Sequence, residues 1–426
     1  MTKIADQRPT TEKFEFIEGT RGFAAIQVVL LHYCSVFFPC FARIGNATHH
    51  SWERSLTSTP LFFLIDGYTA VFVFFLMSGF VLAPSYMNSK LSVPRQITKR
   101  FLRLQFPIFC ALVLAIILIS AFPLQKVELG SLTESAWAAG LLHSTMTIPS
   151  LLKELLASSM LFGYQGTSIF SSISGLIPRL ALSPITVSLD PPLWTIHTEF
   201  WGSILTLLLI VLLRKLPRRI YWLAFAVSFL VLGLSYYSLF LLGICAYILR
   251  DTALLAPRIM ARFYGIVLLA IGILLSSMTP DHWFDQLARV NALHLKDSFQ
   301  LRTELAAVFL FGGVLIQPDI RSALALRFPR WLGKISFSLY LIHFPILFTI
   351  SGVIFKACLT YVSYDVAAAF TAISGIALTL TIAVYFQRYI DAQTVNFARF
   401  VTAKSHLFLI DTVKHNLADE FDKRIR

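Results

Sequence analysis

Charged residues are scarce in this chain. Asp, Glu, Lys and Arg make up only 14% of its 426 residues, whereas soluble domains carry about a quarter. Hydrophobic residues make up 56%, and the mean hydropathy is +0.71. This composition excludes a soluble globule with a single anchor. We predict an all-α protein, a polytopic bundle of membrane helices, with little room for a separate soluble domain.

Cysteines and leader signals are also few or missing. The five cysteines have no metal-like spacing, so we expect no metal site and mostly packing thiols. An exposed Cys40 that forms a disulfide is the alternative that the sequence leaves. The first apolar run begins only after Arg21 and has no small-residue cleavage site, so we predict a retained helix rather than a signal peptide.

Apolar runs predict about ten spanning helices. The fifth, sixth and eighth are short, and two of these could instead form a bent hairpin. The predicted spans are 20–39, 65–86, 102–122, 193–213, 220–235, 237–250, 260–278, 302–318, 332–354 and 366–388.

Basic residues are distributed unequally between the two predicted sides of the membrane and are not gathered in one patch. The net charge of +13 would suit nucleic acid, but Lys and Arg fall in short clusters between apolar runs, so we expect no nucleic-acid partner. With both termini in the cytosol, 27 of the 36 Lys and Arg lie inside. We therefore predict a cytosolic segment 1–19, a transmembrane domain 20–390 and a cytosolic tail 391–426. The outer loop at about 123–192 is a tolerated insertion, lies on the outer surface, or dips in to cover a cavity.

Arg21 and His32 lie in one apolar run. Eleven residues of spacing are about three helical turns, so both side chains share one face. The rise is about 16 Å, close to half of a hydrocarbon core of roughly 30 Å. With Arg21 at the cytosolic headgroups, His32 lies near the midplane, where a titratable group predicts a functional site. The alternatives are a snorkelling anchor for Arg21 and a packing hydrogen bond for His32.

A second pair of cations, Arg100 and Arg103, lies at the cytosolic start of the third span. At positions i and i+3 they project from nearly the same face. They either bind a phosphorylated ligand beside Arg21 or serve as ordinary membrane anchors. Glu199 lies seven residues past Pro192, which predicts a depth of about 10 Å below the outer surface. A carboxylate there needs a wet cavity or a buried cation.

His343 lies twelve residues past Trp331, about 18 Å from the cytosolic edge and therefore level with His32. Tyr340 shares a face with it. Pro345 is expected to bend this helix and free a backbone carbonyl beside the site.

Three further features have mainly structural interpretations. Trp194 lies near the outer start of the fourth span, where indoles commonly anchor. Ser78 and Gly79 form a small pair that predicts close helix packing. For Asp66, near the outer end of the second span, a structural role is slightly favoured over a functional one.

The motifs occur in an ordered series. The series runs Arg21-x10-His32, Phe74-Phe-Leu-Met-Ser-Gly-Phe80, Arg100-Phe-Leu-Arg103, Leu193-Trp-Thr-x3-Glu199 and Ser338-Leu-Tyr-Leu-x-His-Phe-Pro345. From about Glu18 to Pro345, the chain resembles the acyltransferase-3 family of integral-membrane O-acyltransferases.

The resemblance implies transfer of an acyl group, typically acetyl from cytosolic acetyl-CoA, to a hydroxyl of an extracytoplasmic carbohydrate or glycolipid at a bacterial inner membrane. Acyl-CoA is then a co-substrate, and we expect no permanently bound cofactor. The matching positions imply that His32, Glu199 and His343 are catalytic and that the basic residues bind CoA, namely Arg21, Arg100 and Arg103. We also expect Tyr340 and Trp194 to contact substrate.

Two positions depart from the family pattern. Phe72 stands where many members have Asp, and the last helix reads Tyr389-Ile-Asp391-Ala-Gln in place of Tyr-x-Ile-Glu-x-Pro. Neither change touches the motif residues.

The chemistry leaves alternatives open. His32 acts as a general base on the acceptor hydroxyl or carries the acyl group itself, and Glu199 enters from the outer side to orient the acceptor or His343. A rival hypothesis is a transporter or flippase for a glycan or lipid-linked substrate, with His and Glu as a proton relay. Such proteins usually show repeat symmetry, which this sequence lacks. A third is a sensor that only binds ligand. The sequence does not predict an oligomeric state.

Overall fold

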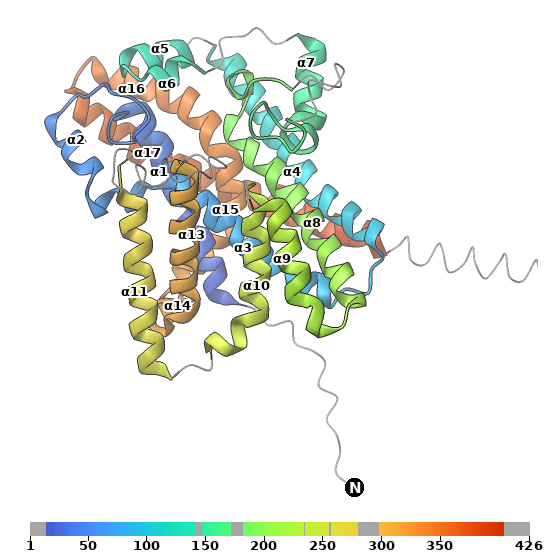
Figure 1. Ribbon diagram of the computed structural model, residues 1–426. Coiled ribbons are helices and arrows are strands. Elements are labelled where there is room, and N and C mark those ends of the chain that lie inside the picture. Colours follow the sequence, from blue (N-terminus) through green and yellow to red (C-terminus); the bar gives the residue numbers. More distant parts are fainter. Residues whose placement is uncertain are drawn as a thin grey trace, which may run out of the picture.

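The computed structural model describes residues 14–403, apart from 124, 142–146, 172–181, 234, 255–256 and 280–297. Within that part of the chain the backbone forms helices and turns and no strands (Figure 1). Eight of the described helices are long and apolar enough to cross a membrane. The predicted all-α polytopic bundle is therefore confirmed, while the sidedness of the termini stays a prediction.

Each of the ten predicted spans corresponds to a helix in the structure. Two of them, α9 and α10, are shorter than the eight spanning candidates, as predicted for the fifth and sixth spans. The helices are α1 (Glu15–Phe37), α3 (Gly67–Met87), α4 (Val93–Ala121), α8 (Trp194–Lys215), α9 (Tyr221–Leu232), α10 (Tyr237–Leu254), α11 (Arg258–Ser277), α13 (Ser298–Ile316), α15 (Arg327–Ile346) and α17 (Tyr364–Phe386).

Some helix boundaries differ from the prediction. Helices α1 and α4 begin several residues early, because the polar residues ahead of each apolar run are already helical. Beyond α17 the chain passes through a π-helical turn at Gln387–Asp391 and stays helical to Ala403. The predicted start of the tail at residue 391 therefore lies inside a helix. From about residue 400 charged and apolar residues alternate, which predicts an amphipathic helix, but this stretch lies mostly outside the described residues.

Helices α1 and α15 pack in parallel through glycines. A Cβ added at Gly22 would lie 2.7 Å from the nitrogen of Gly333, and one at Gly333 would lie 1.8 Å from the carbonyl oxygen of Glu18. Small residues let two backbones approach this closely. Ten residues further along each helix (22 to 32 and 333 to 343), about 15 Å away, are His32 and His343. The parallel register thus brings both histidines to the same depth.

Proline affects α15 where it was expected to. Two residues after Pro345 a π-helical turn begins, Leu347–Ser351, which leads into α16 (Gly352–Leu359). Because proline has no N–H and crowds the carbonyl four residues earlier, it loosens the regular ladder at this point. The irregular turn therefore begins four residues after His343.

Helix α3 packs against α10 at the predicted small pair. A Cβ added at Gly79 would lie 2.2 Å from the carbonyl oxygen of Phe240, and one at Gly243 would lie 2.2 Å from that of Leu76. The prediction of close packing is confirmed. Its neighbour Ser78 points instead into a pocket described below.

Short helices gather at one end of the bundle, which we call the loop end (Figure 1). They are α2 (Ser51–Thr57), α5 (Gln125–Leu132), α6 (Ala136–Ala139) and α7 (Ile148–Lys153). Helix α14 (Pro318–Leu324) lies toward the opposite end. The loop end is built from the connections that the sequence predicts to face outward.

The long predicted loop dips inward. After α7 it forms a π-helix at Glu154–Phe162, which packs against α4 and α8. The Nδ1 of His197 lies 3.1 Å from the carbonyl oxygen of Met160, and its Nε2 accepts the Ile169 N–H at 3.1 Å. Gly163 has φ +72°, and a Cβ there would lie 2.9 Å from the His197 ring. His197 is therefore a buried anchor for this segment.

The structure resolves two questions that the sequence left open, the role of Asp66 and the pairing of Cys40. Asp66 caps α3 by accepting the Thr69 N–H at 3.0 Å, and its other oxygen accepts the Ser276 hydroxyl at 2.5 Å. Cys40 forms no disulfide, and all five cysteines are free.

Candidate active site

His32 of α1 and His343 of α15 form a hydrogen-bonded pair. The Nδ1 of His32 lies 2.9 Å from the Nε2 of His343, and the ring centroids are 5.0 Å apart. His343 is fully buried, whereas His32 keeps part of its surface exposed. Two residues predicted from separate motifs therefore share one site, and one of them stays accessible.

The hydrogen bonds define which ring nitrogens carry protons. The Nδ1 of His343 lies 2.7 Å from the Tyr340 carbonyl oxygen, which can only accept, so this nitrogen carries the proton. A neutral imidazole has one donor and one acceptor nitrogen. The Nε2 of His343 therefore accepts the Nδ1–H of His32. Neutral His32 is left with its lone pair on Nε2, which can act as a base or a nucleophile.

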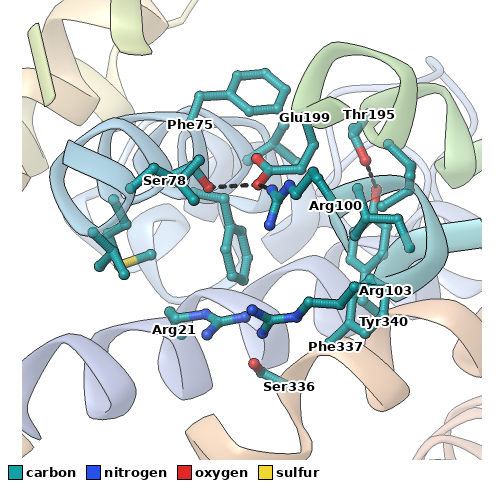
Figure 2. Close-up of a pocket in the computed structure, with 17 residues that line it drawn as sticks. Arg21, Phe75, Ser78, Arg100, Arg103, Thr195, Glu199, Ser336, Phe337 and Tyr340 are labelled. Carbon is teal, nitrogen blue, oxygen red and sulfur yellow. Dashed lines mark hydrogen bonds and ion pairs between the residues drawn. The ribbon is translucent and has the colours of Figure 1, made fainter. Parts of the chain in front are cut away.

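A pocket of about 150 Å³ brings the three predicted cations together. Arg21, Arg100 and Arg103 line it, and Arg21 and Arg103 extend toward one another across it (Figure 2). Much of the remaining wall is apolar and includes Phe74, Phe75, Met77, Leu104 and Phe337. Guanidiniums this close repel one another in a poorly hydrated site. The arrangement therefore favours a ligand with several negative charges and an apolar part.

Glu199 lies in this pocket rather than beside the histidines. It forms an ion pair with Arg100, and the Ser78 hydroxyl donates to the same carboxylate oxygen at 2.8 Å (Figure 2). The cation and cavity that this carboxylate was expected to need are Arg100 and the pocket. Orientation of His343 does not fit this position, whereas orientation of the acceptor stays a prediction. The depth of Glu199 was counted from Pro192 as an outer-surface residue, whereas the Pro192 carbonyl accepts the Tyr340 hydroxyl of α15 inside the bundle. Glu199 instead holds Arg100 in place.

Tyr340 connects the pocket to the histidine pair. Its ring lines the pocket, and the ring centroid lies 5.7 Å from that of His343. Its hydroxyl donates to the Pro192 carbonyl at 2.6 Å and lies 2.7 Å from the Thr195 hydroxyl. Tyr340 therefore belongs both to the wall of the pocket and to the surroundings of His343.

Trp194 takes a different position from the other predicted residues. Its ring packs on Tyr236, with centroids 5.5 Å apart, and the described lining of the pocket does not include it. Substrate contact by Trp194 stays a prediction, as do the catalytic and binding roles of the other site residues.

Trp137 is a site residue that no sequence pattern predicted. This residue lies in α6, and its ring stacks on His32 with centroids 5.9 Å apart and an interplanar angle of 9°. No spacing rule links it to His32, because the contact depends on how the loop folds back. The available signal was an indole within the outer loop, for which dipping inward was one of the alternatives.

Comparison with known proteins identifies the family. A family model described as an acyltransferase domain matches residues 14–388, so the chain belongs to the acyltransferase-3 family. It is also similar to the O-acetyltransferase PaAT-1 of Phomopsis amygdali, with 23% identity over 92% of this chain and 85% of the relative. No solved structure matches the chain significantly.

Family and fold together define the class of protein. The chain is an acyl-transferring enzyme built as an apolar helical bundle, a membrane O-acyltransferase.

Proposed function

We propose that this enzyme transfers an acyl group, most simply acetyl, from acyl-CoA in the arginine pocket to a hydroxyl of an extracytoplasmic carbohydrate or glycolipid. One observation carries the proposal. Tyr340 lines a pocket that holds three guanidiniums and also lies beside His343, whose hydrogen bonds leave the lone pair of His32 on Nε2.

The charge of the pocket supports a phosphorylated donor. Three arginines and one carboxylate, Glu199, line the pocket, and Glu18 pairs with Arg21 at 3.9 Å from outside the lining. Guanidinium groups bind phosphate oxygens bidentately through paired N–H donors, which a lysine cannot reproduce. The phosphates of CoA would lie against Arg21 and Arg103, while the thioester extends along the apolar wall toward Tyr340.

The proposed reaction uses the lone pair of His32. The acceptor hydroxyl gives its proton to Nε2 as its oxygen bonds to the thioester carbonyl carbon. The carbon–sulfur bond then breaks, and the leaving thiolate takes the proton from His32. His343 acts through His32, because its Nε2 accepts the Nδ1–H of His32 and stabilises the imidazolium that His32 transiently becomes. A two-step route would place the acyl group on the same Nε2 and give ping-pong kinetics.

The distribution of basic residues supports a cytosolic donor and an outer acceptor. With 27 of 36 Lys and Arg on one side, the positive-inside rule favours cytosolic termini and an outward loop end. The named relative is an O-acetyltransferase, which agrees with a hydroxyl acceptor. Placement in a bacterial inner membrane rests on the resemblance in sequence motifs.

The direct test is thiol release from acetyl-CoA by the purified protein in proteoliposomes. His32→Ala should abolish turnover while the protein still inserts normally. Arg103→Ala should weaken acetyl-CoA binding, whereas Arg95→Ala, on the same helix but outside the pocket lining, should not. Retained turnover in His32→Ala, or equal binding in both arginine variants, would overturn the assignment.

The acceptor needs a second measurement. Mass spectrometry of surface glycans from a deletion strain should show loss of an acetyl or larger acyl group. Movement of a glycan across the membrane without acyl-CoA consumption would instead support the transporter hypothesis.

A further inference from the structure

Helix α6 brings an indole onto the reactive histidine from the loop end. Trp137 stacks nearly parallel to His32 and also meets Phe344 and Phe348 edge-on, with centroids 6.1 and 5.9 Å away. The aromatic rings of α15 and the following turn therefore enclose Trp137 together with His32. This enclosure lies apart from the arginine pocket, whose described lining includes neither residue.

The backbone that carries Trp137 is fixed against α1. The Ser135 hydroxyl is fully buried and donates to the carbonyl oxygen of Ser35 at 2.7 Å, and the Ala138 N–H donates to the same hydroxyl at 3.2 Å. Ser35 lies one turn beyond His32 on the same helix. A single side chain thus caps α6 and ties it to the helix that bears the histidine.

Two further contacts hold this segment at the loop end. The Nε2 of His49 lies 3.1 Å from the Thr133 carbonyl oxygen, and Lys356 of α16 forms an ion pair of 2.7 Å with Glu128 of α5. Leu129 and Ala138 are buried in the core shared by α1 and α15. The position of the indole is therefore determined by packing on several sides.

We propose that Trp137 is the wall that keeps water from His32, and that it thereby determines how much of the acyl group reaches the acceptor rather than water. The proposal rests on the acyl transfer proposed above. Trp137 is a positioning residue in this role, since it takes no part in bond making.

The chemistry shows why such a wall matters. In transfer, the acceptor hydroxyl gives its proton to Nε2 of His32, its oxygen bonds to the acyl carbon, and the thiol leaves with the proton. A water molecule at the same place follows the same steps and yields a carboxylic acid and the thiol. Because both routes use the same base, selectivity depends on which O–H group can reach Nε2.

The test uses the full-length protein and two readouts. The first is the labelling rate of His32 by diethyl pyrocarbonate, followed by peptide mass spectrometry with His50 as reference. The second is thiol release from acetyl-CoA alone, divided by acetyl transfer to surface glycans prepared from the deletion strain. The variants are Trp137→Ala, Trp137→Phe and Ser135→Ala. Trp331→Leu, which removes an exposed indole at the opposite end of α15, is the matched control.

We expect Trp137→Ala to raise both readouts several-fold, Ser135→Ala to raise them less, and Trp137→Phe and Trp331→Leu to leave them near wild type. Unchanged His32 labelling in Trp137→Ala would overturn the proposal, because labelling does not depend on the reaction. Increased labelling with an unchanged ratio of thiol release to transfer would overturn the part concerning selectivity. Increased labelling in a protein that never consumes acetyl-CoA would leave Trp137 as the shield of His32 and overturn the proposed donor.

Discussion

Proton positions decide the reactivity of the histidine pair at the scale of single residues. Tyr340 contributes twice, since its carbonyl accepts the proton of His343 while its ring lines the donor pocket. His343 in turn accepts from Nδ1 of His32. This series of hydrogen bonds resembles the arrangement in hydrolases, where a buried carboxylate orients a catalytic histidine. Here the imidazole of His343 takes the place of the carboxylate.

Substitution of His343 tests this orienting role. In His343→Gln, the side-chain carbonyl can still accept the Nδ1–H of His32, so we expect partial activity. In His343→Leu no acceptor remains, and we expect kcat to fall by roughly 10²-fold or more, as for loss of general-base catalysis. Steady-state kinetics with acetyl-CoA would measure both. Equal losses in the two variants would show that the hydrogen bond has no part in orienting His32.

Helix positions followed from the sequence, whereas several contacts between helices did not. Apolar runs predicted every long helix, and counting residues from the membrane edge placed His32 and His343 level. Depth counting failed for Glu199, because the connection before it folds into the bundle, where the Tyr340 hydroxyl of α15 donates to the Pro192 carbonyl. The stack of Trp137 on His32 was beyond prediction for the same reason. Periodicity reports which face of a helix is apolar but not what a loop brings to it.

The glycine contact between α1 and α15 is testable at the scale of elements. Gly22→Ala adds a Cβ that would lie 2.7 Å from the backbone of Gly333, whereas Gly312→Ala in α13 meets nothing closer than 3.8 Å. Overpacking of this kind costs typically about 1–3 kcal/mol. We expect Gly22→Ala to lower Tm and activity together, and Gly312→Ala to keep both. Full activity in Gly22→Ala would show that the histidine pair tolerates separation of the helices.

The inward segment at Glu154–Phe162 should respond to pH. Burial raises the pKa of the Glu154 carboxyl, although hydrogen bonds from Tyr164 and Ser188, at 2.6 and 2.7 Å, offset part of the rise. A carboxyl with a raised pKa in the folded state stabilises the fold most when protonated. This contribution is complete below the unfolded pKa and is lost as pH rises through the folded pKa.

Glu154→Gln resembles the protonated acid and removes this dependence. We therefore expect the variant to have a higher Tm than wild type at pH 8, with the difference shrinking toward pH 4. Thermal unfolding across that range in detergent measures it. A constant difference at all pH values would contradict the assignment to Glu154.

The orientation of the whole molecule determines which compartment supplies each substrate. We expect the loop end to face outward and α14 to face the cytosol. Ser55→Cys in α2 and Ser322→Cys in α14 place thiols at exposed positions near the two ends. A membrane-impermeant maleimide applied to intact cells should label the first variant and not the second, beyond the background of wild type. The reverse pattern would show that the donor pocket opens outward.

The pairing of α1 with α15 also constrains how the enzyme is made. Its two histidines are 311 residues apart, so at a synthesis rate of 5–20 residues per second the ribosome needs roughly 15–60 s to reach the second after the first. Throughout that interval α1 has entered the membrane without the surface against which its glycine face packs. A nascent chain released before α15 therefore contains His32 but lacks His343 and is inactive. Until α15 is made, the insertion machinery or the lipid must accommodate the polar ring of His32.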